Sequence, residues 1–159
     1  MKILKLSTLL LLSLLAMASC DNEDDSPVNE LIGIWELNSL VVTNCDDPSD
    51  NTSGDDVIGC ETDDTFEVCN SVQFEFTIGG ELISTSTVIY SLRSTQETQT
   101  ETESETFTYT IDQDSKTITS CDETNDCEEI SYSISGNTLT LVGIEANNCR
   151  TTAVATKTE

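Results

Sequence analysis

Hydrophobic and polar residues alternate with a period of two along most of the chain from Leu31 onward. A clear example places apolar side chains at every second position, namely Val72, Phe74, Phe76 and Ile78. This alternation is typical of strands that bury one face and expose the other. No helical period of useful length interrupts it, so the pattern predicts an all-β domain.

Eight strands are predicted. They cover residues 32–44, 71–78, 81–92, 104–112, 116–121, 127–135, 138–145 and 149–157. Tight turns are indicated at Gly79-Gly80, Asp112–Ser115 and Gly136-Asn137. The other connections are longer and span 45–70, 93–103, 122–126 and 146–148. If sequential strands pair, the tight turns lie at one end and the long loops at the other. We therefore predict a single up-and-down antiparallel barrel, because eight strands can close and leave no edge.

The first 20 residues resemble an export signal. Lys2 and Lys5 precede an apolar run at Leu9–Leu15, which is shorter than the about 20 residues that a membrane span needs. Met17-Ala18-Ser19-Cys20 then resembles the bacterial lipobox. The resemblance implies cleavage before Cys20 and lipid on its thiol. An ordinary secretory signal that ends near a cysteine is the alternative.

An acidic run, Asp21–Asp25, follows Cys20 directly. It resembles the surface-export signal of Bacteroidetes-type lipoproteins, and it also fits a solvated linker because like charges repel. The sequence thus divides into a signal peptide at 1–19, a lipidated acidic tether at 20–30 and one domain at 31–159. We expect an outer-membrane lipoprotein, held to the membrane by the lipid on Cys20, that faces the periplasm or the cell surface.

The chain carries 30 acidic and 6 basic residues, which gives a formal net charge of −24. Loss of the signal peptide would remove Lys2 and Lys5 and leave 4 basic residues, for a charge of −26. Such a field repels nucleic acid and anionic lipid, and it favours cations or basic partners. We expect no nucleic-acid partner, while the sequence identifies no protein partner.

Catalysis is poorly supported. The chain has no histidine, which is the usual general base and the commonest metal ligand. Carboxylate pairs such as Asp46-Asp47, Asp55-Asp56 and Asp63-Asp64 are too common in this composition to single out a catalytic dyad. We predict a non-enzyme without catalytic residues, metal or cofactor. Calcium binding by the acidic 45–70 loop stays an alternative, although the loop does not match the EF-hand pattern.

Six cysteines remain when Cys20 is assigned to lipid. An even number in an exported domain predicts disulfides rather than a zinc site, with 15 pairings open for six cysteines. In a closed barrel the end of the first strand, at Cys45, meets the start of the last, at Cys149. Cys121 and Cys127 flank the connection 122–126 of one hairpin. Two more remain in the 45–70 loop, so all three bridges are expected at the open end. The predicted pairs are Cys45–Cys149, Cys121–Cys127 and Cys60–Cys69.

Gly33-Ile34-Trp35, at the start of the first of these eight strands, resembles the Gly-x-Trp motif of lipocalins. From about Leu31 onward, the arrangement is similar to the lipocalin-like domains of Bacteroidetes-type lipoproteins. The resemblance implies that Gly33 and Trp35 lie at the closed end of the barrel. It also implies that a basic residue at the end of the last strand packs across the tryptophan. Lys157 holds that position, where the family prefers arginine.

A barrel of eight strands is just wide enough to be filled by side chains or to hold one small ligand. The inward-facing aromatic residues expected at its middle and upper levels are Phe74, Tyr90, Phe107, Tyr109 and Tyr132. We therefore favour non-catalytic binding of a small apolar or amphipathic ligand. The negative charge of the rim favours a cationic ligand. The alternative is a solid barrel that acts as an interaction module and binds protein or polysaccharide through its acidic rim loops.

Overall fold

The computed structural model describes residues 30–53, 58–145 and 148–158. Its strands are β1 (Gly33–Thr43), β2 (Thr52–Ser53), β3 (Gly59–Thr62), β4 (Phe66–Phe76), β5 (Glu81–Leu92), β6 (Thr98–Asp112), β7 (Thr117–Cys121), β8 (Cys127–Ser135), β9 (Thr138–Ile144) and β10 (Arg150–Lys157). One 3-10 helix, η2 (Pro48–Asp50), follows β1. The predicted signal peptide, Cys20 and the tether up to residue 29 lie outside the described residues.

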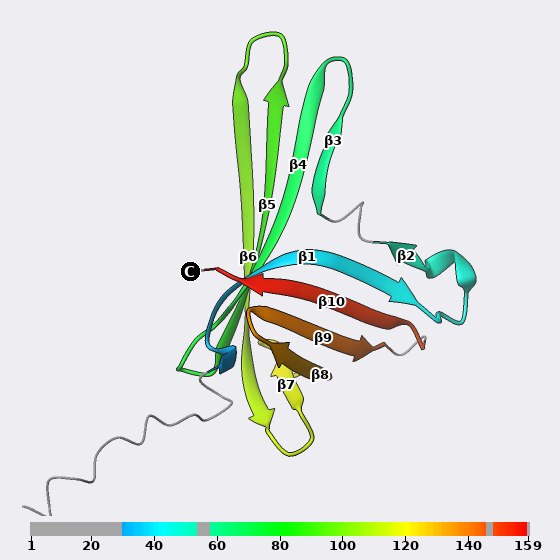
Figure 1. Ribbon diagram of the computed structural model, residues 1–159, viewed down its shortest axis with the longest axis vertical. Coiled ribbons are helices and arrows are strands. Elements are labelled where there is room, and N and C mark those ends of the chain that lie inside the picture. Colours follow the sequence, from blue (N-terminus) through cyan, green and yellow to red (C-terminus); the bar gives the residue numbers. More distant parts are fainter. Residues whose placement is uncertain (1–29, 54–57, 146–147, 159) are drawn as a thin grey trace, which may run out of the picture.

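The strands form a closed antiparallel barrel, as the alternating pattern predicts (Figure 1). Eight of them pair in the ring order β1-β10-β9-β8-β7-β6-β5-β4. The ring closes where β1 meets β4, with Gly33 opposite Phe76 and Glu36 opposite Gln73. Two short additional strands extend the sheet beyond the ring, because β2 pairs with β1 and β3 pairs with β4. The predicted all-β, up-and-down barrel is therefore confirmed.

Two strands are longer than predicted. β4 begins at Phe66 rather than at residue 71, and β6 begins at Thr98 rather than at residue 104. Both stay paired with β5, from Phe66 opposite Leu92 on one side to Thr98 opposite Ser91 on the other. More than half of the predicted loop 93–103 is therefore strand, and the predicted loop 45–70 contains β2, β3 and the first part of β4. Threonine-rich segments suit a strand even without a core to pack on, because the backbone ladder continues between neighbours.

The long strands project from the barrel as a narrow sheet, which we call the blade (Figure 1). We define the blade as β3 with residues 66–72 of β4, 86–92 of β5 and 98–103 of β6. The ring stops below the blade because β1 pairs with β4 only at residues 73–76, and β7 pairs with β6 only at residues 108–112. Strands that serve as barrel wall at one end are thus an open sheet at the other.

The closed end of the barrel is packed solid around Trp35, which is completely buried. The Trp35 indole N–H donates to the backbone oxygen of Leu31 at 2.7 Å, so its polar atom is satisfied inside the core. Phe76 meets Tyr109 edge to face, with ring centroids 5.3 Å apart. The Lys157 Nζ lies 5.1 Å from the centroid of the Trp35 ring. The described side chains at this end therefore form the buried core of the barrel.

The backbone conformation at the start of β1 favours glycine at position 33. Its φ of +127° lies in a region that side-chain-bearing residues rarely adopt. A Cβ built there would also lie 2.9 Å from the Cε of Lys157, which reaches across to donate from Nζ to the backbone oxygen of Glu30 at 2.9 Å. The Gly-x-Trp motif thus provides both the space for Lys157 and the plug of the closed end.

Three disulfides join the cysteines in the pairs expected from the topology. Cys45–Cys149 ties the end of β1 to the start of β10, and Cys121–Cys127 ties β7 to β8. The third bridge, Cys60–Cys69, joins β3 to β4 within the blade. All three bridges lie away from Trp35, toward the open end. In each strand the cysteine is distant from the residues that pair at the closed end.

Candidate functional site

On the open side of the packed core, the barrel widens into a pocket of about 440 Å³. Its floor is apolar, its wall carries two hydroxyl groups and its rim carries four carboxyl groups. The lining residues are Phe74, Leu82, Phe107 and Ile130 on the floor, Ser84 and Ser120 on the wall, and Glu105, Asp122, Asp126 and Glu128 on the rim. The volume falls within the range of small-molecule sites, about 300–1,000 Å³.

The floor residues and the two rim residues that lie on strands, Glu105 and Glu128, face inward because side chains alternate along each strand. Phe107 lies two residues from the buried Tyr109 on β6, and Ile130 lies two residues from the buried Tyr132 on β8. One further step of two residues toward the open end reaches Glu105 on β6 and Glu128 on β8. The inward face therefore changes from apolar to acidic with distance from the core.

The rim turn between β7 and β8 is held in shape by its own hydrogen bonds. The Asp122 carboxylate accepts the backbone N–H of Asp126 at 2.9 Å and that of Thr124 at 2.8 Å. These bonds, led by the one from Asp126, lower the pKa of Asp122, so this carboxylate is ionised at neutral pH. Cys121–Cys127 closes the base of the turn. The acidic rim on this side is thus preorganised without a ligand.

Of the five aromatic residues predicted to face the interior, two line the pocket, namely Phe74 and Phe107. Tyr109 and Tyr132 lie deeper, in the packed core, where they are 8 % and 5 % exposed. The Tyr109 hydroxyl donates to the backbone oxygen of Thr77 at 2.8 Å. The Tyr132 hydroxyl has no hydrogen-bond partner among the described residues. Burial raises the pKa of both hydroxyls.

Tyr90, the fifth, is not inside the barrel. It lies on the blade between Val68 of β4 and Gln99 of β6, and it is 40 % exposed. Its side chain has the inward orientation, but the barrel is no longer closed at this level, and no strand of the described residues lies opposite it. Arg93 directly follows β5 at the tip of the blade, where its guanidinium donates to the backbone oxygen of Asp63 at 3.0 Å.

The rim carboxylates were not singled out by the sequence pattern, although part of the signal was there. Glu105 and Glu128 share the parity of Phe107 and Ile130, so alternation alone assigns them to the inward face. Nothing in the pattern distinguishes them from the many other acidic residues of the chain. Whether an inward-facing residue lines the pocket depends on its distance from the closed end of the barrel. The strand register of the structure gives that distance.

Other hollows in the described part of the molecule lie outside the barrel mouth, including one of about 790 Å³ beside Glu129, Val142 and Ile144 of β8 and β9. One of about 450 Å³ opens where β1 separates from β4, and Leu37 and Asn70 are among its lining residues. Another of about 710 Å³ lies at the blade tip beside Phe66 and Leu92. None of these three lies directly above the barrel core. The mouth pocket is therefore the candidate binding site, because residues predicted to face the interior line it.

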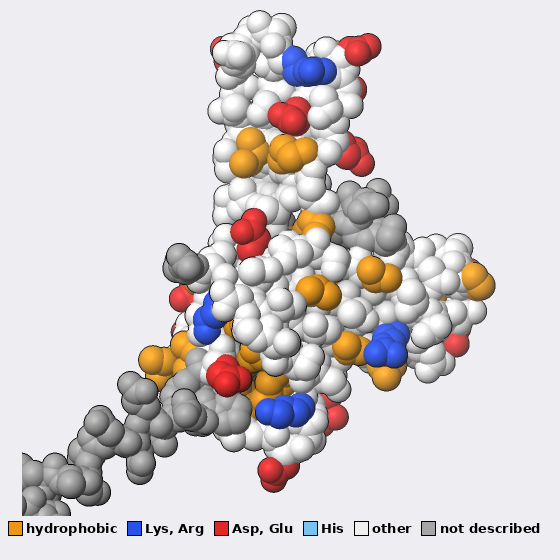
Figure 2. Space-filling view, in the orientation of Figure 1, with side chains coloured by type: hydrophobic (Ala, Val, Ile, Leu, Met, Phe, Trp, Pro, Cys, Tyr) orange, Lys and Arg blue, Asp and Glu red, His pale blue; other side chains and the backbone are white. Residues whose placement is uncertain are grey.

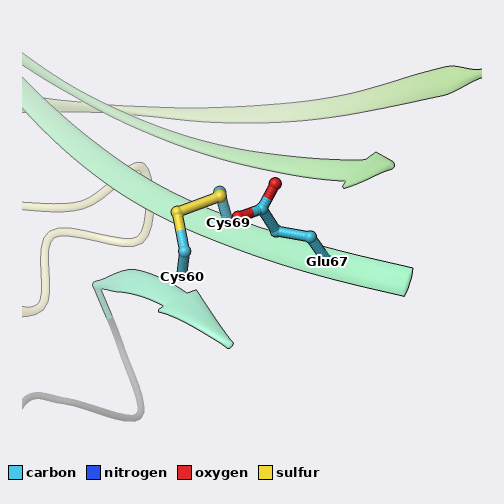
Figure 3. A group of neighbouring side chains, drawn as sticks. All are labelled: Cys60, Glu67 and Cys69. Carbon is cyan, nitrogen blue, oxygen red and sulfur yellow. A yellow bond between two sulfur atoms is a disulfide. The ribbon is translucent and has the colours of Figure 1, made fainter. Parts of the chain in front are cut away.

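Figure 3 shows the group of possible metal ligands formed by Cys60, Glu67 and Cys69. The two sulfur atoms are bonded to each other, so neither is available as a thiolate, and we assign no metal site there. Within the described residues, no other three such groups bring ligand atoms within 4.8 Å of one another. In the acidic 45–70 segment, Asp63 instead accepts backbone N–H groups of its own turn. Asp55 and Asp56 lie outside the described residues.

Comparison with known proteins adds no relative: no protein-family model, curated protein or solved structure matches this chain. None of the helices among the described residues is long and apolar enough to cross a membrane. The class of protein is therefore defined by the fold itself, a closed eight-stranded antiparallel β-barrel with an acidic pocket at its mouth.

Proposed function

We propose that this protein is a non-catalytic binding protein that holds one small amphipathic cation in the pocket at the barrel mouth. The observation that carries the proposal is the apolar floor of Phe74 and Phe107 beneath a rim of carboxylates. An apolar group on the floor gains free energy as its surface leaves water, about 25 cal/mol per Å². A positive group on the same ligand would then lie among Glu105, Asp122 and Glu128, where the field attracts cations.

The proposal places the barrel in the lipocalin-like class and anchors it to the outer membrane through lipid on Cys20. The first described residues, Glu30 and Leu31, lie at the closed end, against Lys157 and Trp35. A tether that arrives there approaches from the end opposite the pocket. The acidic mouth then faces away from the membrane, and a ligand reaches it from the surrounding solution.

No reaction is part of the proposal. The chain lacks histidine, and the six cysteines of the barrel domain are paired in disulfides, which supports binding rather than nucleophilic or acid–base chemistry. The pocket carboxylates serve as a charged rim.

The test uses the chain from Asp21 onward, which contains every residue that the structure describes. Three probes that share one alkyl chain are titrated by calorimetry below their micelle concentrations: an alkyltrimethylammonium, a neutral alkyl glycoside and an alkyl sulfate. We expect the cation to bind best, the neutral probe more weakly and the anion not at all. Native mass spectrometry should show one probe per chain and three intact disulfides. Equal affinity for the cation and the anion would reject the acidic rim as a binding element.

Variants locate the bound probe. Ser84→Leu adds an apolar side chain to the pocket wall and should abolish binding while the barrel stays folded. Glu128→Gln should weaken binding of the cation by about two- to fivefold, since exposed ion pairs contribute little, and leave the neutral probe unaffected. Glu129→Gln is the matched control, because successive residues of β8 face opposite sides of the sheet and Glu129 does not line the mouth pocket. Unchanged affinity in Ser84→Leu would contradict binding in the pocket.

A further inference from the structure

The outer edge of β6 is unpaired along the blade. β6 pairs with β5 from Thr98 to Thr108, but β7 covers its other side only from Thr108 to Asp112. In the part of the chain that the structure describes, no strand lies against the other side of residues 98–107. These residues are exposed except for Phe107, which is half-buried. An edge of this length is a template for pairing with another strand.

The hydrogen-bond pattern shows which backbone groups this edge offers. Tyr109 donates its backbone N–H to Gly80, and Leu92 donates to the backbone oxygen of Glu97, so odd-numbered residues of β6 bond to β5 at both ends of the pairing. The register between them has no irregularity. Since successive residues of an antiparallel strand bond to opposite sides, the even-numbered residues direct their N–H and C=O groups to the free edge. They are Thr98, Thr100, Thr102, Ser104 and Thr106.

Carboxylates alternate with these edge residues. Glu101, Glu103 and Glu105 share the inward parity of Phe107, so their side chains project on one face of the blade beside the free edge. A second copy of this edge is a poor partner, because it would bring like charges next to one another. Figure 2 shows hydrophobic side chains only in isolated groups on the visible face of the blade, with acidic side chains on either side of them. The partner that this edge fits is extended and positively charged.

We propose that the free edge of β6 binds an extended basic segment of another protein by β-strand addition. The backbone of the segment pairs with the outward N–H and C=O groups of Thr100, Thr102 and Ser104. Lysine or arginine at every second position then lies opposite Glu101 and Glu103, on the same face of the enlarged sheet. This site is separate from the mouth pocket, whose lining includes Glu105 but neither Glu101 nor Glu103.

The probe is a synthetic peptide of alternating lysine and threonine, with a control of the same composition in which the lysines are contiguous. Binding is measured at moderate salt, and amide exchange is followed by NMR. We expect the alternating peptide to bind at least about fivefold more tightly. We also expect slower exchange at the amides of Thr100, Thr102, Ser104 and Thr106. The amides of Glu101 and Glu103 already bond to β5 and should change little.

Two variants test the two components separately. Thr102→Pro removes one outward N–H and no bond to β5, so the edge loses a donor while the barrel keeps its structure. Glu101→Gln combined with Glu103→Gln should weaken the alternating peptide about tenfold, since it removes two cross-strand charge pairs. The matched control is Glu36→Gln with Glu75→Gln, which changes the net charge equally on exposed positions of β1 and β4.

Several results would overturn the proposal. Equal binding of the alternating and contiguous peptides, or equal weakening by both pairs of substitutions, would show general attraction to an acidic protein. Binding without protection of the outward amides would exclude strand addition, and so would unchanged binding in Thr102→Pro. The outcome is independent of the pocket, because Ser84→Leu should leave the peptide affinity unchanged and Thr102→Pro should leave the alkylammonium affinity unchanged.

Discussion

The barrel and the blade share three strands, β4, β5 and β6, yet one region buries the apolar side chains of these strands and the other does not. Phe76 at one end of β4 is 1 % exposed, whereas Phe66 at the other end is 45 % exposed. On β5, Leu82 is 8 % exposed and Leu92 is 43 % exposed. These residues all have the same inward orientation in the paired register. Alternation therefore decides which face a side chain takes, and ring closure decides whether that face is buried.

The two regions are consequently stabilised in different ways. A large side chain that is fully buried in the barrel contributes about 1.5–3 kcal/mol relative to an exposed one. The blade depends on its backbone ladder and on the Cys60–Cys69 bridge, because none of the described strands forms a second layer over it. Regions with few buried apolar contacts open at lower free energy than the core. We expect the blade to open locally while the barrel remains folded.

The largest difference should appear when the same residue is removed from both ends of β4. Phe76→Ala should lower the free energy of unfolding by about 3–5 kcal/mol, because it leaves a cavity beside Trp35 and Tyr109. Phe66→Ala should cost about 1 kcal/mol or less, since the ring is half in solvent. Urea unfolding followed by the fluorescence of Trp35, the single tryptophan, measures the barrel in both variants. Equal losses would refute the division into two regions.

The disulfides provide the next comparison. Replacement of Cys45 and Cys149 by alanine should destabilise the barrel by about 4 kcal/mol, because the bridge spans 104 residues and restricts the unfolded chain strongly. Replacement of Cys60 and Cys69, separated by 9 residues, should leave the Trp35 transition nearly unchanged. Its effect should instead be faster amide exchange in β3. A joint loss of barrel stability in both double variants would show that blade and barrel unfold as one unit.

The sequence predicted the barrel well because the barrel is where local pattern and burial agree. Alternation located the eight strands, and the neighbouring positions of the first and last strands in a closed ring gave the Cys45–Cys149 pair. The β6 part of the blade was not predicted as strand because residues 98–103 contain no apolar side chain, so a pattern based on burial had nothing to detect there. Threonine and the ladder to β5 keep this segment in a strand nevertheless.

The candidate pocket was predictable only in part. Phe74 and Phe107 follow from parity and closeness to the core. Tyr90 has the same parity, but the sequence does not show where the ring ends, and this decides whether a side chain faces a cavity or solvent. The Asp122 turn was expected only as a connection. Its role at the rim depends on hydrogen bonds from Thr124 and Asp126, which the structure supplies.

A smaller effect separates the two tyrosines in the core. Tyr109→Phe should cost about 0.5–1.5 kcal/mol, since it removes the hydrogen bond to the backbone oxygen of Thr77. Tyr132→Phe should be neutral or stabilising, because the hydroxyl that it removes is buried without a partner among the described residues. Tyr90→Phe on the blade is the exposed control and should have no effect. Urea unfolding of the three variants gives the ranking, and a loss in Tyr132→Phe as large as that in Tyr109→Phe would contradict it.

The smallest expected effect concerns pH and distinguishes the two regions once more. Backbone N–H donors lower the pKa of Asp122 on the barrel rim, with Asp126 the leading donor, and that of Asp63 beside the blade, with Phe66 the leading donor. A carboxyl whose pKa is lower in the folded than in the unfolded state stabilises the fold above its unfolded pKa, near 3.8. This contribution disappears as the pH falls through the lower, folded value.

Asp122→Ala should therefore lower the urea midpoint of the Trp35 transition at neutral pH, and the difference from the native chain should vanish as the pH falls below 3.8. Asp63→Ala should leave that transition unchanged at every pH and speed amide exchange in the blade instead. Glu123→Ala is the control for loss of one charge in the same turn, because its carboxylate accepts no hydrogen bond within the described structure. A difference between Asp122→Ala and the native chain that persists at low pH would show that lost packing, rather than ionisation, accounts for it.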